Sequence, residues 1–260
     1  MKTLCTTLAL SLLTAGSAVA HSTAITVIDG DQRCIISDGV PDHDVGTWRE
    51  GAVVEPQDHF FCVDASPELT GEITDRAQIS GMTINGIPLR PGTAEYYDPE
   101  ADAERPWSRD RSSGWNVEGV GGLNMDAQNA HVDGAGLYHY HGIPEVVVGN
   151  LDGTLFAYAA DGFEIHYVGG DMQSSYQLKE GERASGPGGV HDGTYVQDYE
   201  YVAGSGTLDE CNGTVVDGQY VYYATDTFPF FPRCFLGTVT DDAFGGGGDR
   251  PRGAAGNDGG

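Results

Sequence analysis

The chain has 260 residues, and its 39 aspartates and glutamates against 13 lysines and arginines give a formal net charge of −26 at pH 7. Such a surface repels nucleic acid and anionic lipid, so the charge excludes both as partners. It suits a cation as a ligand, although solubility alone accounts for most of the carboxylates. A chain of this length can form one large domain or two small ones.

Residues 1–20 are typical of a secretory signal peptide. They combine a basic start at Lys2, an apolar stretch over residues 4–13 and an A-x-A cleavage site at residues 18–20. The apolar stretch is too short to span a bilayer, and no later stretch approaches the length of a transmembrane helix. We therefore expect a secreted protein, periplasmic or extracellular, without membrane insertion.

Short apolar or alternating runs, separated by turn formers, predict strands through most of the remaining chain. In chain order they cover residues 24–28, 33–37, 60–63, 77–84, 87–89, 136–142, 155–160, 163–168, 195–202 and 219–225. Residues 93–111 are polar and predict a long loop, and no segment carries apolar residues at helical spacing. We expect an all-β or mostly β fold, a single sandwich- or barrel-like domain with long loops over residues 21–240. Residues 241–260, rich in glycine and aspartate, are expected to form a disordered tail.

Cysteine usage agrees with export. Four cysteines remain once the signal peptide is removed: Cys34, Cys62, Cys211 and Cys234. An even number in an oxidising compartment predicts two disulfides, and of the three pairings we favour Cys34–Cys62 and Cys211–Cys234 because each closes a loop of moderate length. A zinc site of four cysteines is the alternative, which the lack of any C-x-x-C pair disfavours.

The segment Tyr138-His139-Tyr140-His141 carries the clearest chemistry. As a strand it places His139 and His141 on one face and the two tyrosines on the other. Neutral imidazoles at positions i and i+2 can share a metal ion, and His131, just upstream, is a third candidate ligand. Alternatively, the histidines are polar neighbours in a hydrogen-bonded core and the tyrosines pack around them. Imidazole suits copper and zinc, and the affinity order favours copper.

Glu145 follows His141 by four residues and is a candidate metal ligand or general base, although it equally fits a surface carboxylate. Calcium is a further candidate ion, since hard oxygen ligands recur at Asp192, Asp198, Asp209 and Glu210, without the spacing of an EF-hand. No nucleophile in a strand–turn–helix setting, phosphate loop or dinucleotide fingerprint is recognisable. The sequence therefore predicts no catalytic nucleophile and no organic cofactor.

Around the His/Tyr segment the chain resembles the YHYH family of secreted proteins, named for that tetrapeptide. The similarity runs from Arg33 to Val239 and includes Gly136-Leu137-Tyr138-His139-Tyr140-His141-Gly142, Leu208-Asp209-Glu210-Cys211-Asn212-Gly213 and Thr227-Phe228-Pro229-Phe230-Phe231-Pro232-Arg233. One departure is the run from Asp161 to Tyr167, where similar members read Asp-Gly-Phe-Pro-Ile-Tyr-Gly. The resemblance implies that the His/Tyr segment is a site, and it names no activity.

A second and shorter resemblance is to the metal motifs of cupins. His139-x-His141-x-x-x-Glu145 has the spacing of the first motif, and the glycine-rich stretch before His191 is close to the second, with its histidine one residue early. Cupins bind a metal through three histidines and one glutamate. The similarity is a geometric precedent for the convergence of these four residues, and it assigns no fold.

These observations support two main functions. The first is a secreted protein that binds a divalent metal ion for sequestration or delivery. The second is a metal-dependent hydrolase or oxidoreductase at the same residues, with Glu145 as the base. A third possibility is an adhesion or matrix domain with a protein or glycan partner and a purely structural His/Tyr cluster. A closed site of four ligands favours binding, whereas an open site of three ligands facing a cleft favours catalysis.

Overall fold

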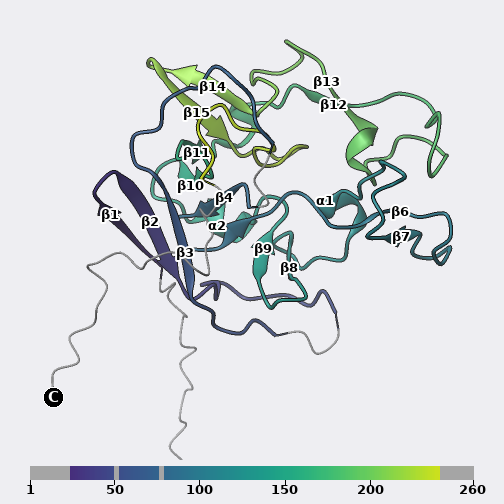
Figure 1. Ribbon diagram of the computed structural model, residues 1–260, viewed down its shortest axis with the longest axis horizontal. Helices are drawn as coiled ribbons and strands as arrows, with labels where there is room; N and C mark the ends of the chain where they lie inside the picture. The colour runs from purple at the N-terminus through teal and green to yellow at the C-terminus, as the bar shows by residue number, and fades with distance from the viewer. Residues whose placement is uncertain (1–23, 50–52, 76–78, 241–260) are drawn as a thin grey trace, which may run out of the picture.

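The computed structural model describes residues 24–49, 53–75 and 79–240. Strands dominate and form four sheets (Figure 1). The prediction of an all-β or mostly β fold is therefore confirmed. The predicted signal peptide and the predicted tail lie outside the described residues.

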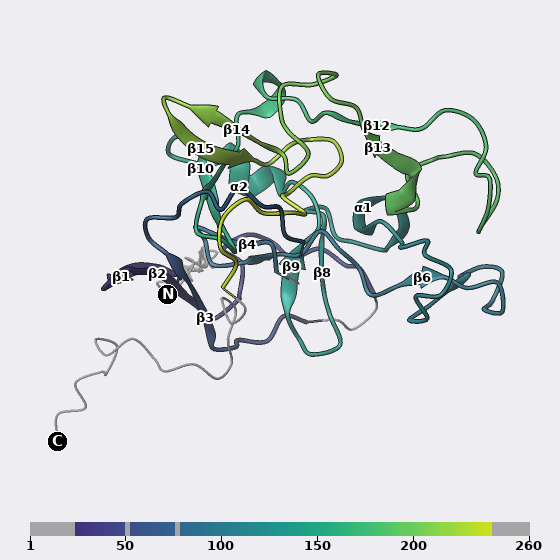
Figure 2. The same ribbon diagram turned by 45° about the horizontal axis from the view of Figure 1, so that its top comes forward.

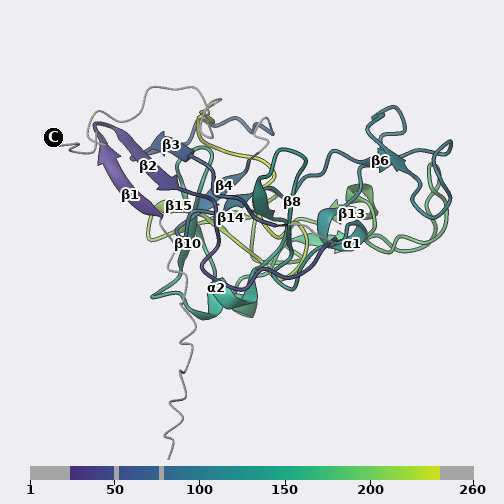
Figure 3. The same cartoon turned by 90° about the horizontal axis from the view of Figure 1, so that it is seen from below.

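The first sheet has three antiparallel strands in the order β1-β2-β3. They are β1 (Ile25–Asp29), β2 (Gln32–Ser37) and β3 (His59–Asp64). Each matches a predicted strand to within two residues at its ends. In Figures 1 and 3 this sheet lies at one end of the molecule.

The largest sheet has eight strands in the order β14-β15-β11-β10-β4-β5-β9-β8. They are β4 (Gly81–Thr83), β5 (Pro88–Leu89), β8 (Ala130–Val132), β9 (Tyr138–Tyr140), β10 (Leu155–Ala159), β11 (Glu164–His166), β14 (Gly213–Val216) and β15 (Gln219–Tyr223). The pairs β11–β15 and β5–β9 are parallel, and the others are antiparallel. The predicted histidine strand is β9, next to the terminal strand β8 (Figure 2).

Two small sheets lie at the end of the molecule opposite β1–β3 (Figures 1 and 3). One pairs β6 (Tyr96–Tyr97) with β7 (Trp107–Ser108), and the other pairs β12 (Tyr176–Leu178) with β13 (Tyr199–Tyr201). The first occupies the segment predicted as a long loop. The second shortens the strand predicted over residues 195–202, because a 3-10 turn over Val196–Asp198 precedes β13.

Two single-turn α-helices, which periodicity does not predict, are α1 (Gly119–Gly122) and α2 (Glu145–Gly149). In α2 the restricted φ of Pro144 starts the turn, and the side chain of Asn150 donates a hydrogen bond to the carbonyl of Val146 at 2.8 Å. One helical turn is too short to show an amphipathic period. Within the described ranges the structure contains no helix with the length and apolarity that a membrane crossing requires.

The main core is rich in aromatic side chains from the large sheet and the C-terminal segment, including Tyr138, Tyr140, Phe156, Tyr222, Phe231 and Phe235, all at most 1% exposed. Each such ring removes about 150–250 Å² from water. A second cluster joins Ile35, Phe61 and Val63 of the first sheet to Met82 and Tyr158 of the large one. The two sheets therefore pack face to face there, as in a sandwich.

Both predicted disulfides are present. Cys34 and Cys62 are directly opposite each other on β2 and β3, with their Cα atoms 4.0 Å apart. Cys211 precedes β14 and joins Cys234 in the C-terminal segment, with 5.0 Å between Cα atoms. The alternative of a four-cysteine zinc site is therefore wrong.

A buried ion cluster fixes the irregular stretch before β13. The guanidinium of Arg183 donates two hydrogen bonds of 2.7 Å to Asp198 and one of 2.5 Å to Asp192. The side chain of Arg183 is 5% exposed and that of Asp198 is fully buried. The Asp198 carboxylate also accepts the backbone N–H groups of Gly193 and Tyr195. These bonds hold the chain in place where it has no regular sheet partner.

Candidate metal centre

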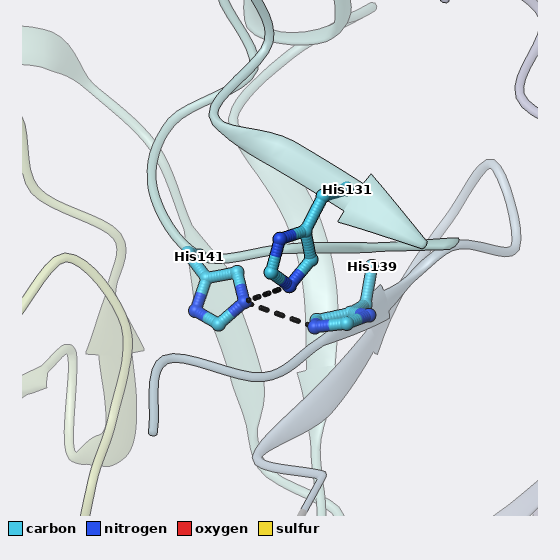
Figure 4. Close-up of side chains that lie close together, drawn as sticks. All are labelled: His131, His139 and His141. Atoms are coloured by element: carbon cyan, nitrogen blue, oxygen red, sulfur yellow. Dashed lines mark hydrogen bonds between the residues drawn. The ribbon is translucent and has the colours of Figure 1, made fainter. Parts of the chain in front are cut away.

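Three histidines converge on the face of β8 and β9 that points away from the core. His131 on β8 is directly opposite His139 on β9, and His141 follows two residues later on the same face. The Nε2 atom of His141 lies 2.9 Å from Nε2 of His139 and 3.2 Å from Nε2 of His131 (Figure 4). Among the described residues they form the one group of three or more histidines, cysteines or carboxylates that could hold a metal ion.

The arrangement of these nitrogens suits a shared metal ion better than hydrogen bonds alone. Bonds of about 2.0–2.1 Å at tetrahedral angles place two ligand nitrogens about 3.3 Å apart, close to the 3.2 Å between His141 and His131, whereas the 2.9 Å between His141 and His139 also fits a hydrogen bond. If hydrogen bonds alone held the rings together, Nε2 of His141 would have to form one with His139 and a second with His131. A ring nitrogen carries either one hydrogen or one in-plane lone pair, so it can pair with only one of them. A shared ion would use the lone pairs of all three rings.

The backbone sets the tautomer that metal binding requires. Nδ1 of His139 lies 2.9 Å from the carbonyl oxygen of Leu137, and it must be the donor because a carbonyl only accepts. Its Nε2 therefore presents a lone pair to the cluster. A backbone hydrogen bond to Asn124 raises the pKa of His131, which is the direction expected when a ring N–H donates to a carbonyl. Pro91 makes a weaker backbone contact with His141, whose Nδ1 forms no hydrogen bond of good geometry with the described residues.

Burial keeps the three rings neutral. The side chains of His139 and His141 are each 1% exposed. Burial lowers the pKa of His139 to about 3 and the pKa of His141 well below its usual value, and it also lowers the pKa of His131. Neutral imidazole is the form that binds metals, so no proton has to leave at pH 7.

The tyrosines of the same strand lock its other face. The hydroxyl of Tyr138 donates a hydrogen bond of 2.6 Å to Asp126, and the hydroxyl of Tyr140 lies 2.7 Å from Nε2 of His43. Asp126 also accepts the backbone N–H groups of Gln128 and Ala130, which shapes the turn into β8. Asp126 was not a sequence candidate, since a lone carboxylate in a turn carries no signal of this role.

The turn between β8 and β9 is held by Asp133. Its carboxylate accepts the backbone N–H groups of Ala135 and Leu137 at 2.8 and 3.1 Å, and it pairs with Arg90 at 2.7 Å. Asx turns of this kind fix the register of a hairpin. The register is what places His131 opposite His139.

Gly119 in α1 leaves room for His141. A β-carbon at this position would collide with Nδ1 of His141 and crowd its Cγ and Cβ atoms. The preceding residue, Glu118, is 1% exposed and pairs with Arg233 at 2.7 Å, which holds α1 against the cluster. Burial raises the pKa of Glu118, and Arg233 opposes the shift.

We expect Gly119→Ala to weaken metal binding by about 10–100-fold, because the added methyl group displaces the His141 ring. Isothermal titration of the metal-free protein with Zn²⁺ measures the effect. Gly149→Ala is the matched control, since Gly149 is also helical and a β-carbon there meets nothing within 4 Å. Equal affinities in the two variants would contradict the proposed contact.

The remaining sequence candidates lie elsewhere. Glu145 is exposed in the first turn of α2 and lines a separate cavity of about 570 Å³ with Tyr167 and Asp226. His191 contacts the carbonyl oxygen of Gly181 at 3.1 Å. Neither belongs to the histidine cluster, so the convergence suggested by the cupin motifs extends to His139 and His141 only.

Three of the four carboxylates considered for calcium, Asp192, Asp198 and Asp209, have other partners, and Glu210 belongs to no cluster of three or more metal-ligand side chains among the described residues. Asp192 and Asp198 are bound to Arg183. Asp209 accepts the backbone N–H groups of Cys211 and Gly213 and the hydroxyl of Tyr220. None of them belongs to a group of metal-ligand type among the described residues.

A cavity of about 860 Å³ opens beside the cluster, and His131 and His141 form part of its wall. The segment from Thr93 to Arg109, predicted as a loop, supplies much of the opposite wall. Two carboxylates of the cavity wall, Glu95 and Asp133, raise the pKa of His131, against the larger lowering caused by burial. The third histidine, His139, is not part of this wall, so the cluster meets the cavity on one side.

A family model described as YHYH protein matches residues 60–237, which include all three histidines. No curated protein and no solved structure matches the chain.

Proposed function

The chain belongs to the YHYH protein family, and we propose that it binds one divalent transition-metal ion through the Nε2 atoms of His131, His139 and His141. The observation that supports this most is the convergence of three neutral imidazoles within coordination distance of a common centre. Imidazole ligands favour copper or zinc over calcium or magnesium. Two of the three rings, those of His139 and His141, are buried, and a bound ion would give their Nε2 lone pairs a partner.

We place this protein outside the cytoplasm. Two disulfides are typical of secreted and periplasmic proteins, and the predicted signal peptide agrees with them. The excess of acidic residues also favours a metal cation as the partner.

Elemental analysis of the tag-free mature protein tests the proposal. We expect about one equivalent of copper or zinc in the wild type, bound before purification or after reconstitution. The His139→Ala/His141→Ala variant should contain none. Since both rings are buried, His131→Gln provides a second variant at the more exposed cavity wall. It should lose more affinity than the about 10–100-fold typical for an outer-sphere partner.

His191→Ala is the control, because that ring lies outside the cluster and should leave the metal content unchanged. Absence of metal from the wild type after incubation with Cu²⁺ and with Zn²⁺ would overturn the proposal. The His/Tyr segment would then be a structural motif, as in the adhesion or matrix hypothesis.

A second candidate function, a metal-dependent hydrolase or oxidoreductase, is favoured by one observation. Two of the three ligands border the cavity of about 860 Å³, so a fourth coordination position would face solvent or substrate. A three-ligand site with an open position is the arrangement of catalytic zinc centres. For this function Glu95 replaces Glu145 as the candidate base, because Glu95 shares the cavity with His131.

A further inference from the structure

The wall of the cavity beside the histidine cluster carries a small excess of basic side chains, whereas the chain as a whole is strongly acidic. Its wall includes Arg49, Arg90, Arg105 and Arg109, four of the 13 basic residues of a chain with net charge −26. Three carboxylates share the wall, Glu95, Glu104 and Asp133. In the chain as a whole acidic residues outnumber basic ones threefold, 39 to 13. Such a local concentration of arginine is unexpected if it arises only from solubility.

Most of these arginines are available to a ligand. Arg90 is paired with Asp133, both side chains being 24% exposed. In contrast, Arg49, Arg105 and Arg109 form no salt bridge with any residue in the described ranges. The guanidinium of Arg105 lies 5.8 Å from the ring centre of Trp107, which limits its freedom without neutralising its charge.

We propose that this cavity binds a small organic oxyanion, with one oxygen on the open position of the metal and its remaining charge on Arg105 and Arg109. The inference rests on the proposed metal centre, and it names the class of ligand that would bind there. A guanidinium fork matches the oxygens of a carboxylate or a phosphate ester, and a divalent ion held by neutral ligands adds positive charge at the far end. The cavity volume of about 860 Å³ is large enough for a metabolite-sized ligand.

Charge also disfavours other occupants. A polyanion such as a nucleic acid would be repelled by a chain of net charge −26, whereas a small anion needs only the cavity wall. A neutral sugar would make no use of the charge of the exposed guanidinium groups of Arg49, Arg105 and Arg109.

Calorimetric titration of the metal-loaded protein with succinate and with inorganic phosphate tests the proposal, with succinamide as the uncharged analogue of succinate. We expect one of the two anions to bind and succinamide not to bind. The Arg105→Gln/Arg109→Gln variant should bind the anion at least about tenfold more weakly, the loss expected for charge-assisted hydrogen bonds. Succinate alone would indicate a carboxylate ligand, and phosphate alone a phosphate ester.

Arg111→Gln is the matched control. Arg111 is also exposed and lies 5.8 Å from the ring centre of Tyr96, but it is not part of the cavity wall. Its affinity for the anion should equal that of the wild type. Failure of both anions to bind, or equal weakening in the two arginine variants, would overturn the inference.

Cobalt-loaded protein separates this inference from the proposed function. A change in the visible spectrum of Co²⁺ on adding the anion would show that the anion reaches the metal and supports both. If the protein takes up no metal but binds the anion through Arg105 and Arg109, the metal centre fails and the anion site stands. If cobalt binds and no anion does, the metal centre stands and the anion site fails.

Discussion

Replacing Arg183 with methionine is expected to lower the free energy of unfolding by about 3–5 kcal/mol. The substitution leaves the Asp198 carboxylate fully buried without its two 2.7 Å hydrogen bonds from the guanidinium. The remaining backbone donors, from Gly193 and Tyr195, do not neutralise a buried charge. Urea unfolding at pH 7, with wild type and variant under the same metal load, measures the difference.

Arg90→Met is the matched control for this prediction. It also removes an arginine from a 2.7 Å pair, but both side chains of the Arg90–Asp133 pair are 24% exposed. Water can solvate the Asp133 carboxylate that remains, so we expect a loss of about 1 kcal/mol or less. Similar losses of unfolding free energy in Arg183→Met and Arg90→Met would contradict the argument that burial causes the larger effect at Arg183.

Acidification is expected to destabilise the metal-free protein steeply below about pH 6.5, the ordinary pKa of histidine. His139 and His141 are neutral in the folded state because burial lowers their pKa values, in His139 to about 3. In the unfolded chain both rings take up protons near pH 6.5, so the unfolded state binds more protons below that pH. Each ring then removes about 1.4 kcal/mol of stability per pH unit until its folded-state pKa is reached.

Urea midpoints at pH 7, 6 and 5 after treatment with a chelator check this dependence. The carboxylates of Glu118 and Asp161 act in the opposite direction, since burial raises their pKa values. A His139→Gln variant isolates the contribution of the histidine, and its slope should be shallower by about 1.4 kcal/mol per pH unit. The same slope in wild type and variant would show that His139 does not titrate on unfolding.

The strands that alternation or apolar runs predict are largely those the structure contains. Apolar runs bounded by turn formers place β2, β3, β10 and β15 correctly, both in β3, where burial alternates along the strand, and in β10, which is buried on both faces. The strand β14 (Gly213–Val216) was missed, although the turn after it carries a signal. Asp217 and Gly218 both have positive φ, 51° and 84°, as a tight Asp-Gly hairpin requires.

For the candidate site, the sequence predicts the ligands better than their surroundings. The spacing of His139 and His141 fixes their common face within one strand, and His131 joins them because β8 and β9 form one hairpin. Glu145 fails to join because Pro144 starts a helical turn that carries it away from the strand. A sequence spacing has meaning only while the backbone keeps one conformation, which here ends before residue 144.

The residues of the cavity wall could not be predicted from the sequence, for a different reason. Arg49, Arg90 and the pair Arg105 and Arg109 come from three separate segments, and only tertiary packing brings them beside the histidines. Their positions in the sequence carry no periodic signal, and the strongly acidic composition conceals them. The role of Gly119 could not be predicted either, because it depends on the ring of His141, which only tertiary packing brings close.

Both faces of β9 are packed against other parts of the protein, and this has a kinetic consequence. One face of this strand carries the histidines, and the other contributes Tyr138 and Tyr140 to the core. Fraying of the strand would therefore expose both tyrosine rings to solvent. Local opening there would therefore expose buried core side chains as well as the histidines. An ion bound at the proposed centre would therefore enter and leave by the cavity, past His131, and its residence time would be set by ligand exchange at that side and not by opening of the sheet.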